Sequence, residues 1–241
     1  GGLQLDGIND RVDSADLDFT NGSSFSISTN YNGTGVLFGK GDDYQYYLST
    51  GSTITFNIWN SAGANIVTLT GSGVSTTTWN NVIIIYDGTT GTANMYLDGT
   101  NVSQDDSTNG TWRNQAQETT LGFGFTTGTA SGRFTGIIDD FTIFNTTLNS
   151  SEISSMVSSN TILNTSSVRA HWELNETSGL VASDSSANNY DGNLTDYYGA
   201  IWNESNGIVG AGYGFDGSGD FIKIDTAEGD LGLTTTGTWS M

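Results

Sequence analysis

Residues 79–88 have the sequence WNNVIIIYDG, and residues 93–102 have the sequence ANMYLDGTNV. Both stretches are rich in β-branched, aromatic or other apolar residues, and each contains an Asp-Gly pair, a dipeptide that favours tight turns. Two such stretches joined by a few polar residues are typical of a β-hairpin. The sequence therefore predicts a hairpin over residues 79–99.

Short strands joined by polar turns are predicted on both sides of this hairpin. Residues 24–31 alternate between apolar and polar side chains, as a half-buried strand does, and residues 32–35 (NGTG) form a predicted turn. Residues 148–157 carry apolar side chains at helical spacing and predict one short surface helix. Further strands are predicted at residues 36–38, 43–48, 53–59, 66–69, 120–125 and 134–144. The pattern favours an all-β fold, a mostly antiparallel β-sandwich.

One stretch of the chain occurs twice. Residues 2–12 read GLQLDGINDRV, and residues 212–222 read GYGFDGSGDFI. At an offset of 210 residues, the Asp-Gly pair and the Asp three residues beyond it coincide. A match at one fixed spacing indicates tandem modules. The predicted organisation is a first module over residues 1–158, a polar linker over 159–168, and the start of a second module over 169–241.

The charge balance excludes several classes of partner. Six Lys and Arg stand against 26 Asp and Glu, so the formal net charge is −20. A nucleic-acid-binding protein needs a basic surface, and anionic membrane surfaces are disfavoured by the same sign. The sequence contains no apolar run of 18 residues, the length that a membrane-spanning helix needs. Cysteine is absent, and the single His171 makes a Ser-His-Asp triad nearly impossible; we expect it to be a rim residue beside a core Trp.

Five motifs, in a permuted order, resemble those of a known family. They are the strand Trp172-Glu-Leu-Asn-Glu176, the loop from Asp184 to Gly192, the F-D-G-x-x-D-type strand at both Phe215 and Leu5, the hairpin from Trp79 to Gly99, and the closing strand from Ile138 to Asn145. Together they resemble the laminin-G-like, concanavalin A-like jelly roll in its bacterial and archaeal repeat form. The resemblance covers nearly the whole chain and implies one nearly complete jelly-roll module plus the N-terminal part of a second.

The limits of the modules depart from the family pattern. Residues 1–158 lack the family's first strand and loop, whereas residues 169–241 hold only its first third. Two explanations fit. Either the chain is an excerpt of a longer protein with modules of about 210 residues, or residues 169–241 of one subunit complete residues 1–158 of the next. The excerpt is favoured, because a completed domain would carry one Asp-Gly stretch too many.

The resemblance also implies one structural Ca²⁺ where the closing strand meets the first strands. Such a site needs six to eight hard oxygen ligands, both carboxylates and carbonyls. The alternative is that these Asp side chains only stabilise turns. The ligands that the resemblance assigns are Asp139, Asp184, Asn188, Asp191, Asp6, Asp10, Asp216 and Asp220.

Related jelly rolls include β-glucan hydrolases, so catalysis must be tested against the sequence. Those enzymes carry closely spaced acids on one strand face, in patterns such as E-x-D-x-E. No such triplet is present here. Glu173 and Glu176 have an odd spacing and would point to opposite faces of a strand, and the adjacent Asp139 and Asp140 would do the same. The sequence therefore predicts a protein without enzymatic activity.

Carbohydrate binding is the alternative role. Tyr44, Tyr46 and Tyr47, with Trp59 and Trp112, could form an aromatic platform for a sugar. The alternative is that aromatic side chains alternating along strands are core residues, which is the more common role for Trp59, Trp79 and Trp172. Trp112 lies in the polar loop Asn-Gly-Thr-Trp-Arg and is the best candidate for an exposed aromatic side chain. A lectin-like module that binds a sugar through Trp112 and the three Tyr residues is the second functional hypothesis.

The leading hypothesis is a structural or adhesive protein outside the cell. Stacked, calcium-stiffened modules are consistent with a filament, a surface layer or an adhesin at the cell surface, in which the chain contacts copies of itself. Asn-x-Ser/Thr sequons are compatible with a secreted glycoprotein. They lie at Asn21, Asn32, Asn101, Asn109, Asn145, Asn149, Asn164, Asn175, Asn193 and Asn203.

Overall fold

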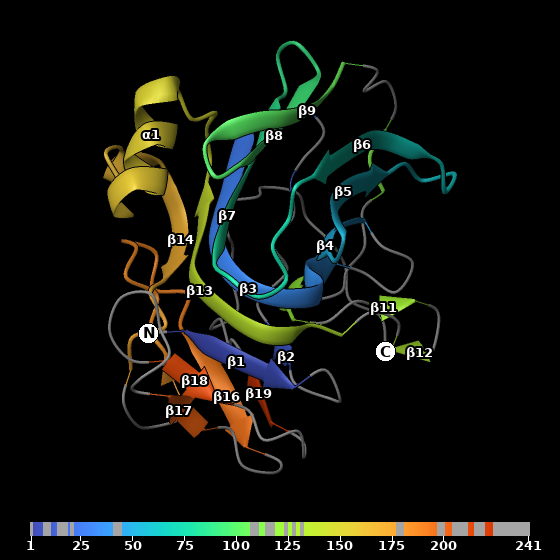
Figure 1. The fold of residues 1–241 in the computed structure, drawn as a ribbon. Coiled ribbons are helices and arrows are strands. Elements are labelled where there is room, and N and C mark those ends of the chain that lie inside the picture. The colour runs from blue at the N-terminus through green and yellow to red at the C-terminus, as the bar shows by residue number, and fades with distance from the viewer. Residues whose placement is uncertain are drawn as a thin grey trace, which may run out of the picture.

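Strands form two curved layers, and one helix lies on the outside of the first layer (Figure 1). The described residues of this computed structural model are 2–6, 11–13, 19, 22–40, 45–106, 111–113, 119–122, 125–126, 129–130, 133–176, 181–196, 201–203, 212–214 and 220–223. The helical elements are α1 (Ser150–Ser159) and a short 3₁₀ helix (Thr165–Ser167). The strands are β1 (Leu3–Asp6), β2 (Arg11–Asp13), β3 (Phe25–Lys40), β4 (Tyr46–Thr50), β5 (Thr53–Trp59), β6 (Asn65–Ser72), β7 (Asn80–Asp87), β8 (Thr92–Leu97), β9 (Thr100–Asp105), β10 (Thr119–Leu121), β11 (Phe125–Thr126), β12 (Thr129–Ala130), β13 (Thr135–Phe144), β14 (Val168–Trp172), β15 (Val181–Ala182), β16 (Gly192–Asp196), β17 (Ile201–Asn203), β18 (Gly212–Gly214) and β19 (Asp220–Lys223).

The long strand β3 belongs to both layers. Its first half pairs antiparallel with β7 and β13, and its second half pairs antiparallel with β4 and β10. The first layer continues from β7 to β8 and β9, and β14 lies on the far side of β13. The second layer continues from β4 to β5 and β6, and β2 lies beyond β10. This arrangement confirms the predicted antiparallel β-sandwich of jelly-roll type.

The turn predicted at residues 32–35 is wrong, because β3 runs through it as a bent strand. Gly33 lies opposite Gly136 of β13, and their φ angles are 153° and 138°. A Cβ atom on Gly33 would overlap the carbonyl oxygen of Thr135, and one on Gly136 would overlap that of Asn32. Only glycine allows this close approach, so the pair lets β3 bend from its partners in the first layer to its partners in the second.

Strand β7 is buried on both faces, which explains its continuous apolar sequence. Ile84 points into the main core between the two layers, whereas Ile83 and Ile85 lie in a second cluster under helix α1. The predicted hairpin is confirmed, since β7 and β8 pair over six residue pairs from Val82↔Leu97 to Asp87↔Thr92.

Helix α1 covers the outer face of the first layer (Figure 1). The Asn149 side chain caps the N-terminus of α1 by accepting hydrogen bonds from the backbone N–H groups of Ser151 and Glu152. In turn, the Glu152 carboxylate accepts the backbone N–H of Asn149. Ile153 and Met156 are buried against the sheet. Among the described residues, no helix has the length and apolar character needed to cross a membrane.

The edges of β6 and β9 are joined by side chains. The Ser103 hydroxyl accepts the backbone N–H of Thr70 at 3.0 Å, and the Asp105 carboxylate accepts that of Thr68 at 2.7 Å. Side chains from one layer therefore satisfy the backbone donors at the edge of the other.

The segment after the helix returns to the first layer. Strand β14 pairs antiparallel with β13, with Phe141 opposite Trp172, and the two rings lie 6.0 Å apart in the main core. In this chain β14 therefore extends the sheet built by residues 1–158. The division into modules at 158 and 169 remains a prediction about repeats.

Candidate functional site

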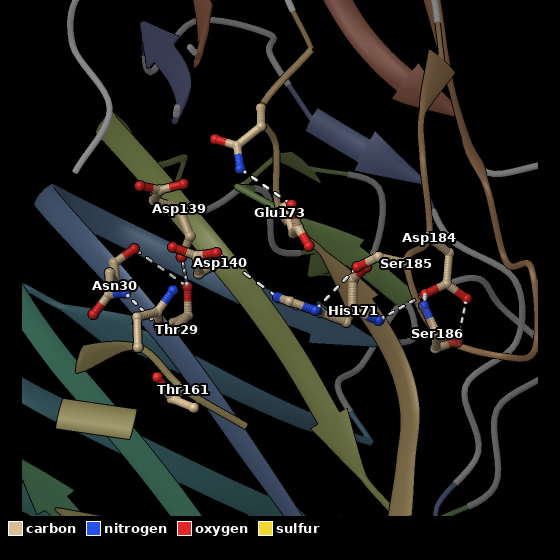
Figure 2. A network of polar contacts seen from close by, with 12 residues as sticks. Thr29, Asn30, Asp139, Asp140, Thr161, His171, Glu173, Asp184, Ser185 and Ser186 are labelled. Carbon is tan, nitrogen blue, oxygen red and sulfur yellow. Dashed lines mark hydrogen bonds and ion pairs between the residues drawn. The ribbon is translucent and has the colours of Figure 1, made fainter. Parts of the chain in front are cut away.

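A network of polar side chains lies where β13 meets β14 and the loop after β15 (Figure 2). The pairing of β13 with β3 is interrupted between Asp139 and Thr142, and Asp140 adopts a left-handed backbone conformation with φ of 50°. Asp139 is fully buried and Asp140 nearly so. Two adjacent carboxylates in the interior of a strand are costly to bury, which marks this bulge as a candidate site.

The loop of residues 183–191 is organised by the carboxylate of Asp184. Its Oδ1 accepts the backbone N–H groups of His171 and Ser186 at 2.8 and 2.9 Å. Its Oδ2 accepts the Ser186 hydroxyl at 2.6 Å and the backbone N–H of Tyr190 at 2.8 Å. Four hydrogen bonds fill the acceptor positions of this buried side chain, so its role here is to hold the loop on β14.

The other two predicted ligands in this loop also make structural hydrogen bonds. Asn188 donates to the carbonyl oxygen of Arg169 at 2.8 Å, and Asp191 accepts the backbone N–H of Asp184 at 2.8 Å. The geometry of the loop therefore matches the turn-stabilising alternative and does not direct the Asp184 carboxylate toward a metal ion.

Of the remaining predicted ligands, the two that the structure describes, Asp6 and Asp220, lie away from Asp139. Asp6 of β1 lies opposite Thr135, four positions along β13 from Asp139, a distance of roughly 13 Å. Asp220 begins β19, opposite Asp196 in the other layer. Asp10 and Asp216 lie outside the described residues. No group of three or more acidic or His side chains in the described part of the chain is placed to hold a metal ion.

One observation does fit a cation at the bulge. The Oδ2 atom of Asp140 is buried and accepts no hydrogen bond from the described residues, while its Oδ1 lies 3.7 Å from Nε2 of His171. A buried carboxylate oxygen without a donor is what a cation would compensate. Asp140 thus offers a cation one carboxylate oxygen that accepts no hydrogen bond from the described residues, whereas both oxygens of Asp184 already accept hydrogen bonds.

Ser185, His171 and Asp140 lie in a row, an arrangement that the sequence did not predict (Figure 2). The Ser185 hydroxyl donates to the carbonyl oxygen of His171 at 3.1 Å, and its oxygen lies 3.0 Å from Nδ1 of the ring. Which of the two atoms donates in the contact with Nδ1 depends on the tautomer of the ring. The 3.7 Å between Nε2 and Asp140 is too long for a hydrogen bond. His171 is half-buried beside the core residue Trp172, as expected.

Glu173 and Glu176 differ in their surroundings. Glu173 is exposed, whereas Glu176 is half-buried and accepts the backbone N–H of Ser183 at 2.6 Å. Burial raises the pKa of Glu176, against the lowering effect of that hydrogen bond. The chain between them leaves the strand, with φ of 54° at Leu174, so strand alternation does not relate the two acids.

The predicted aromatic platform is rearranged in the structure. The expectation that Trp112 is exposed is wrong: its side chain is 5% exposed and its ring packs edge-on against Tyr86 at 4.9 Å. Tyr46 is buried in the main core, and Tyr44 lies outside the described residues. Tyr47 alone of the four is described at the surface.

Tyr47 stacks on Trp59, a residue for which the sequence left both the aromatic platform and the core open. The ring centroids lie 5.4 Å apart, with the planes inclined by 22°. The two residues are half-buried on the outer face of β4 and β5, beside Asn57, which lies opposite Tyr47. Strand alternation contained this signal: Ile54, Phe56 and Ile58 point inward, and Trp59 has the opposite parity.

The predicted glycosylation sites differ in exposure. Asn101, Asn145 and Asn149 are exposed, whereas the side chains of Asn32, Asn164 and Asn175 are half-buried. Asn193 and Asn203 lie on β16 and β17, where side chains are not described, and Asn21 and Asn109 lie outside the described residues. Modification at these sites remains a prediction.

The paired strands and the two layers place the protein among the jelly-roll β-sandwiches. A laminin-G-like family model, described as the concanavalin A-like lectin/glucanases superfamily, matches residues 6–154. The chain belongs to this superfamily, which confirms the resemblance. A comparison with curated proteins finds no match.

Solved structures with the same fold share little sequence with this chain. The CBM40 domain of a Ruminococcus gnavus IT-sialidase, bound to α2,3-sialyllactose, has a TM-score of 0.53 and 16% identity, over 65% of this chain and 96% of that one. NanB sialidase from Streptococcus pneumoniae has a TM-score of 0.53 and 20% identity, over 64% of this chain and 27% of that one. A candidate carbohydrate-binding protein from Bacteroides ovatus has a TM-score of 0.56 and 13% identity, over 77% of this chain and 58% of that one. These likenesses establish the fold alone.

Proposed function

We propose that this chain is a non-catalytic glycan-binding module of an extracellular surface protein. The observation that carries the proposal is the stacked pair of Tyr47 and Trp59 on the outer face of the second layer. The carbohydrate-binding proteins among the structures of similar fold support it. Aromatic side chains offer the apolar C–H face of a sugar ring a large contact area with little loss of conformational entropy.

The polar groups beside the aromatic pair suit the hydroxyl groups of a sugar. Asn65 is exposed and lies opposite Trp59, and its Nδ2 is 3.5 Å from Oδ1 of the buried Asn57, so one accessible amide lies next to the rings. Thr55 of β5 lies opposite Ser49 of β4 on one side and Thr70 of β6 on the other. With a net charge of −20, the protein repels sugars that carry carboxylates or sulfates. The proposed ligand is therefore an uncharged glycan.

Replacing Trp59 by Ala tests this site. We expect glycan affinity to fall at least about tenfold, which corresponds to about 1.4 kcal/mol, because the stacking surface is lost. A glycan array identifies the ligand, and calorimetry then measures the affinity of the variant. Trp79→Ala is the matched control, since Trp79 is also half-buried but lies outside the pair, and its affinity should equal that of the wild type. Equal affinities for all three proteins would refute the site.

We propose in addition that Ca²⁺ binds at Asp139 and Asp140 and stiffens β13 at the point where its pairing with β14 begins. The buried carboxylate pair supports this assignment. Removing Ca²⁺ with a chelator should lower the melting temperature by about 5–10 °C, as binding at 100 times Kd would predict. In Asp139→Asn the chelator should have no effect, whatever the melting temperature of that variant. A wild-type melting temperature that does not respond to chelator or to added Ca²⁺ would contradict the proposal.

A structural role in a surface filament or adhesin is the second candidate function. It is favoured by the duplicated stretch, whose two copies lie side by side in the sheets. A filament built from copies of this chain requires a means of connecting one copy to the next.

A further inference from the structure

The two copies of the duplicated stretch pair with each other. Strand β18 runs parallel to β1, with Leu3 beside Tyr213. Strand β19 runs parallel to β2, with Val12 beside Ile222. Both pairings join residues that are 210 positions apart, the spacing at which the two sequences match. Equivalent residues of the two copies are therefore neighbours in both layers.

The first copy lies between the sandwich and the second copy. On its other side β1 pairs antiparallel with β13, and β2 pairs antiparallel with β10, where Val12 is opposite Leu121. Because β18 is parallel to β1, it already has the direction needed to pair antiparallel with β13, and the same holds for β19 and β10. Each of the strands β18 and β19 is displaced by one strand spacing, about 4.8 Å, from the position in which it would pair with β13 or β10.

We propose that strands β18 and β19 can replace strands β1 and β2 in the sandwich, so that either copy completes the two sheets. The match in sequence, direction and register means that the replacement needs neither a reversal of the strands nor a shift along them. The replacing strands come from the same chain or from a second copy of it. In the second case the displaced strands remain available to a further copy, and the chains connect head to tail. This inference does not depend on glycan binding.

Proline substitutions at equivalent positions test the exchange in the full-length chain. Pro removes a backbone donor and is not tolerated in a strand that has neighbours on both sides. If either copy suffices, Val12→Pro and Ile222→Pro should each lower the melting temperature by less than about 5 °C, whereas the double variant should lose more than about 15 °C. Additive losses, or a Val12→Pro variant as unstable as the double variant, would overturn the proposal.

A disulfide reports the exchanged state directly, because the chain has no cysteine of its own. In the structure β2 separates β10 from β19, so the Cα atoms of residues 121 and 222 are roughly 9.6 Å apart, beyond the reach of a disulfide. We expect Leu121→Cys/Ile222→Cys to form a disulfide in the Val12→Pro background and not with Val12 intact. A monomeric cross-linked product identifies exchange within one chain, and a dimeric product identifies exchange between chains. If no disulfide forms in the Val12→Pro background, exchange does not occur.

Discussion

Trp172→Ala should lower the free energy of unfolding by about 3–5 kcal/mol, the range observed when a large aromatic side chain is removed from a core. The Trp172 side chain is 1% exposed, packs on Phe141, and donates its indole N–H to the carbonyl oxygen of Tyr190 at 2.9 Å. It therefore fastens β14 and the loop of residues 183–191 to the sandwich. Urea-induced unfolding followed by far-ultraviolet circular dichroism measures the change.

Leu163→Ala is the control for this measurement. Leu163 is 58% exposed, so its truncation should change stability by no more than about 0.5 kcal/mol. If residues after 168 were independent of the sandwich, Trp172→Ala would leave the main unfolding transition unchanged. That result would show that β14 does not belong to the core described by the structure.

Asp184→Asn should cost about 2–4 kcal/mol, although it changes the side-chain shape very little. Each carboxylate oxygen of Asp184 accepts two hydrogen bonds. The substitution replaces one of these oxygens by an NH₂ group. Placed at Oδ2 it would face the N–H of Tyr190, and placed at Oδ1 it would face those of His171 and Ser186. Either way, buried donors lose their acceptor. Chemical denaturation at neutral pH measures the loss.

Two comparisons make the Asp184 result specific. Asp106 is exposed, and Asp106→Asn should change stability by no more than about 0.5 kcal/mol. The effect of Asp184→Asn should also be the same with and without chelator, because the carboxylate bonds to the loop itself. A loss of stability that disappears in chelator would instead identify Asp184 as a calcium ligand and contradict the hydrogen-bonded loop.

The sequence predicted the elements of the fold better than their connections. The β7–β8 hairpin followed from local patterns, namely strand alternation and Asp-Gly turns. The bend in β3 did not, because residues 32–35 have the composition of a turn. Its geometry depends on Gly136, about 100 positions away, which allows the two backbones to approach. A local pattern does not contain information of this kind.

The candidate site shows the same limit. Trp112 was expected at the surface because its neighbours are polar, yet its ring fills a space between Phe25 and Tyr86 that only the packed sheets define. The sequence left Trp59 between the aromatic platform and the core, although strand parity placed it outside. Parity within a strand was the more reliable guide, since it follows from backbone geometry and not from composition.

The hydrogen bonds that the backbone of β6 donates to the side chains of Ser103 and Asp105 have a consequence for aggregation. An exposed strand edge with unpaired N–H groups can recruit strands of other molecules and seed fibrils. Two of those groups on β6 are already occupied by side chains of β9, and Asp105 adds a negative charge there. These two positions on the edge of β6 are thus protected against pairing with strands of other molecules. Substituting both residues by Ala would leave these donors open to neighbouring molecules.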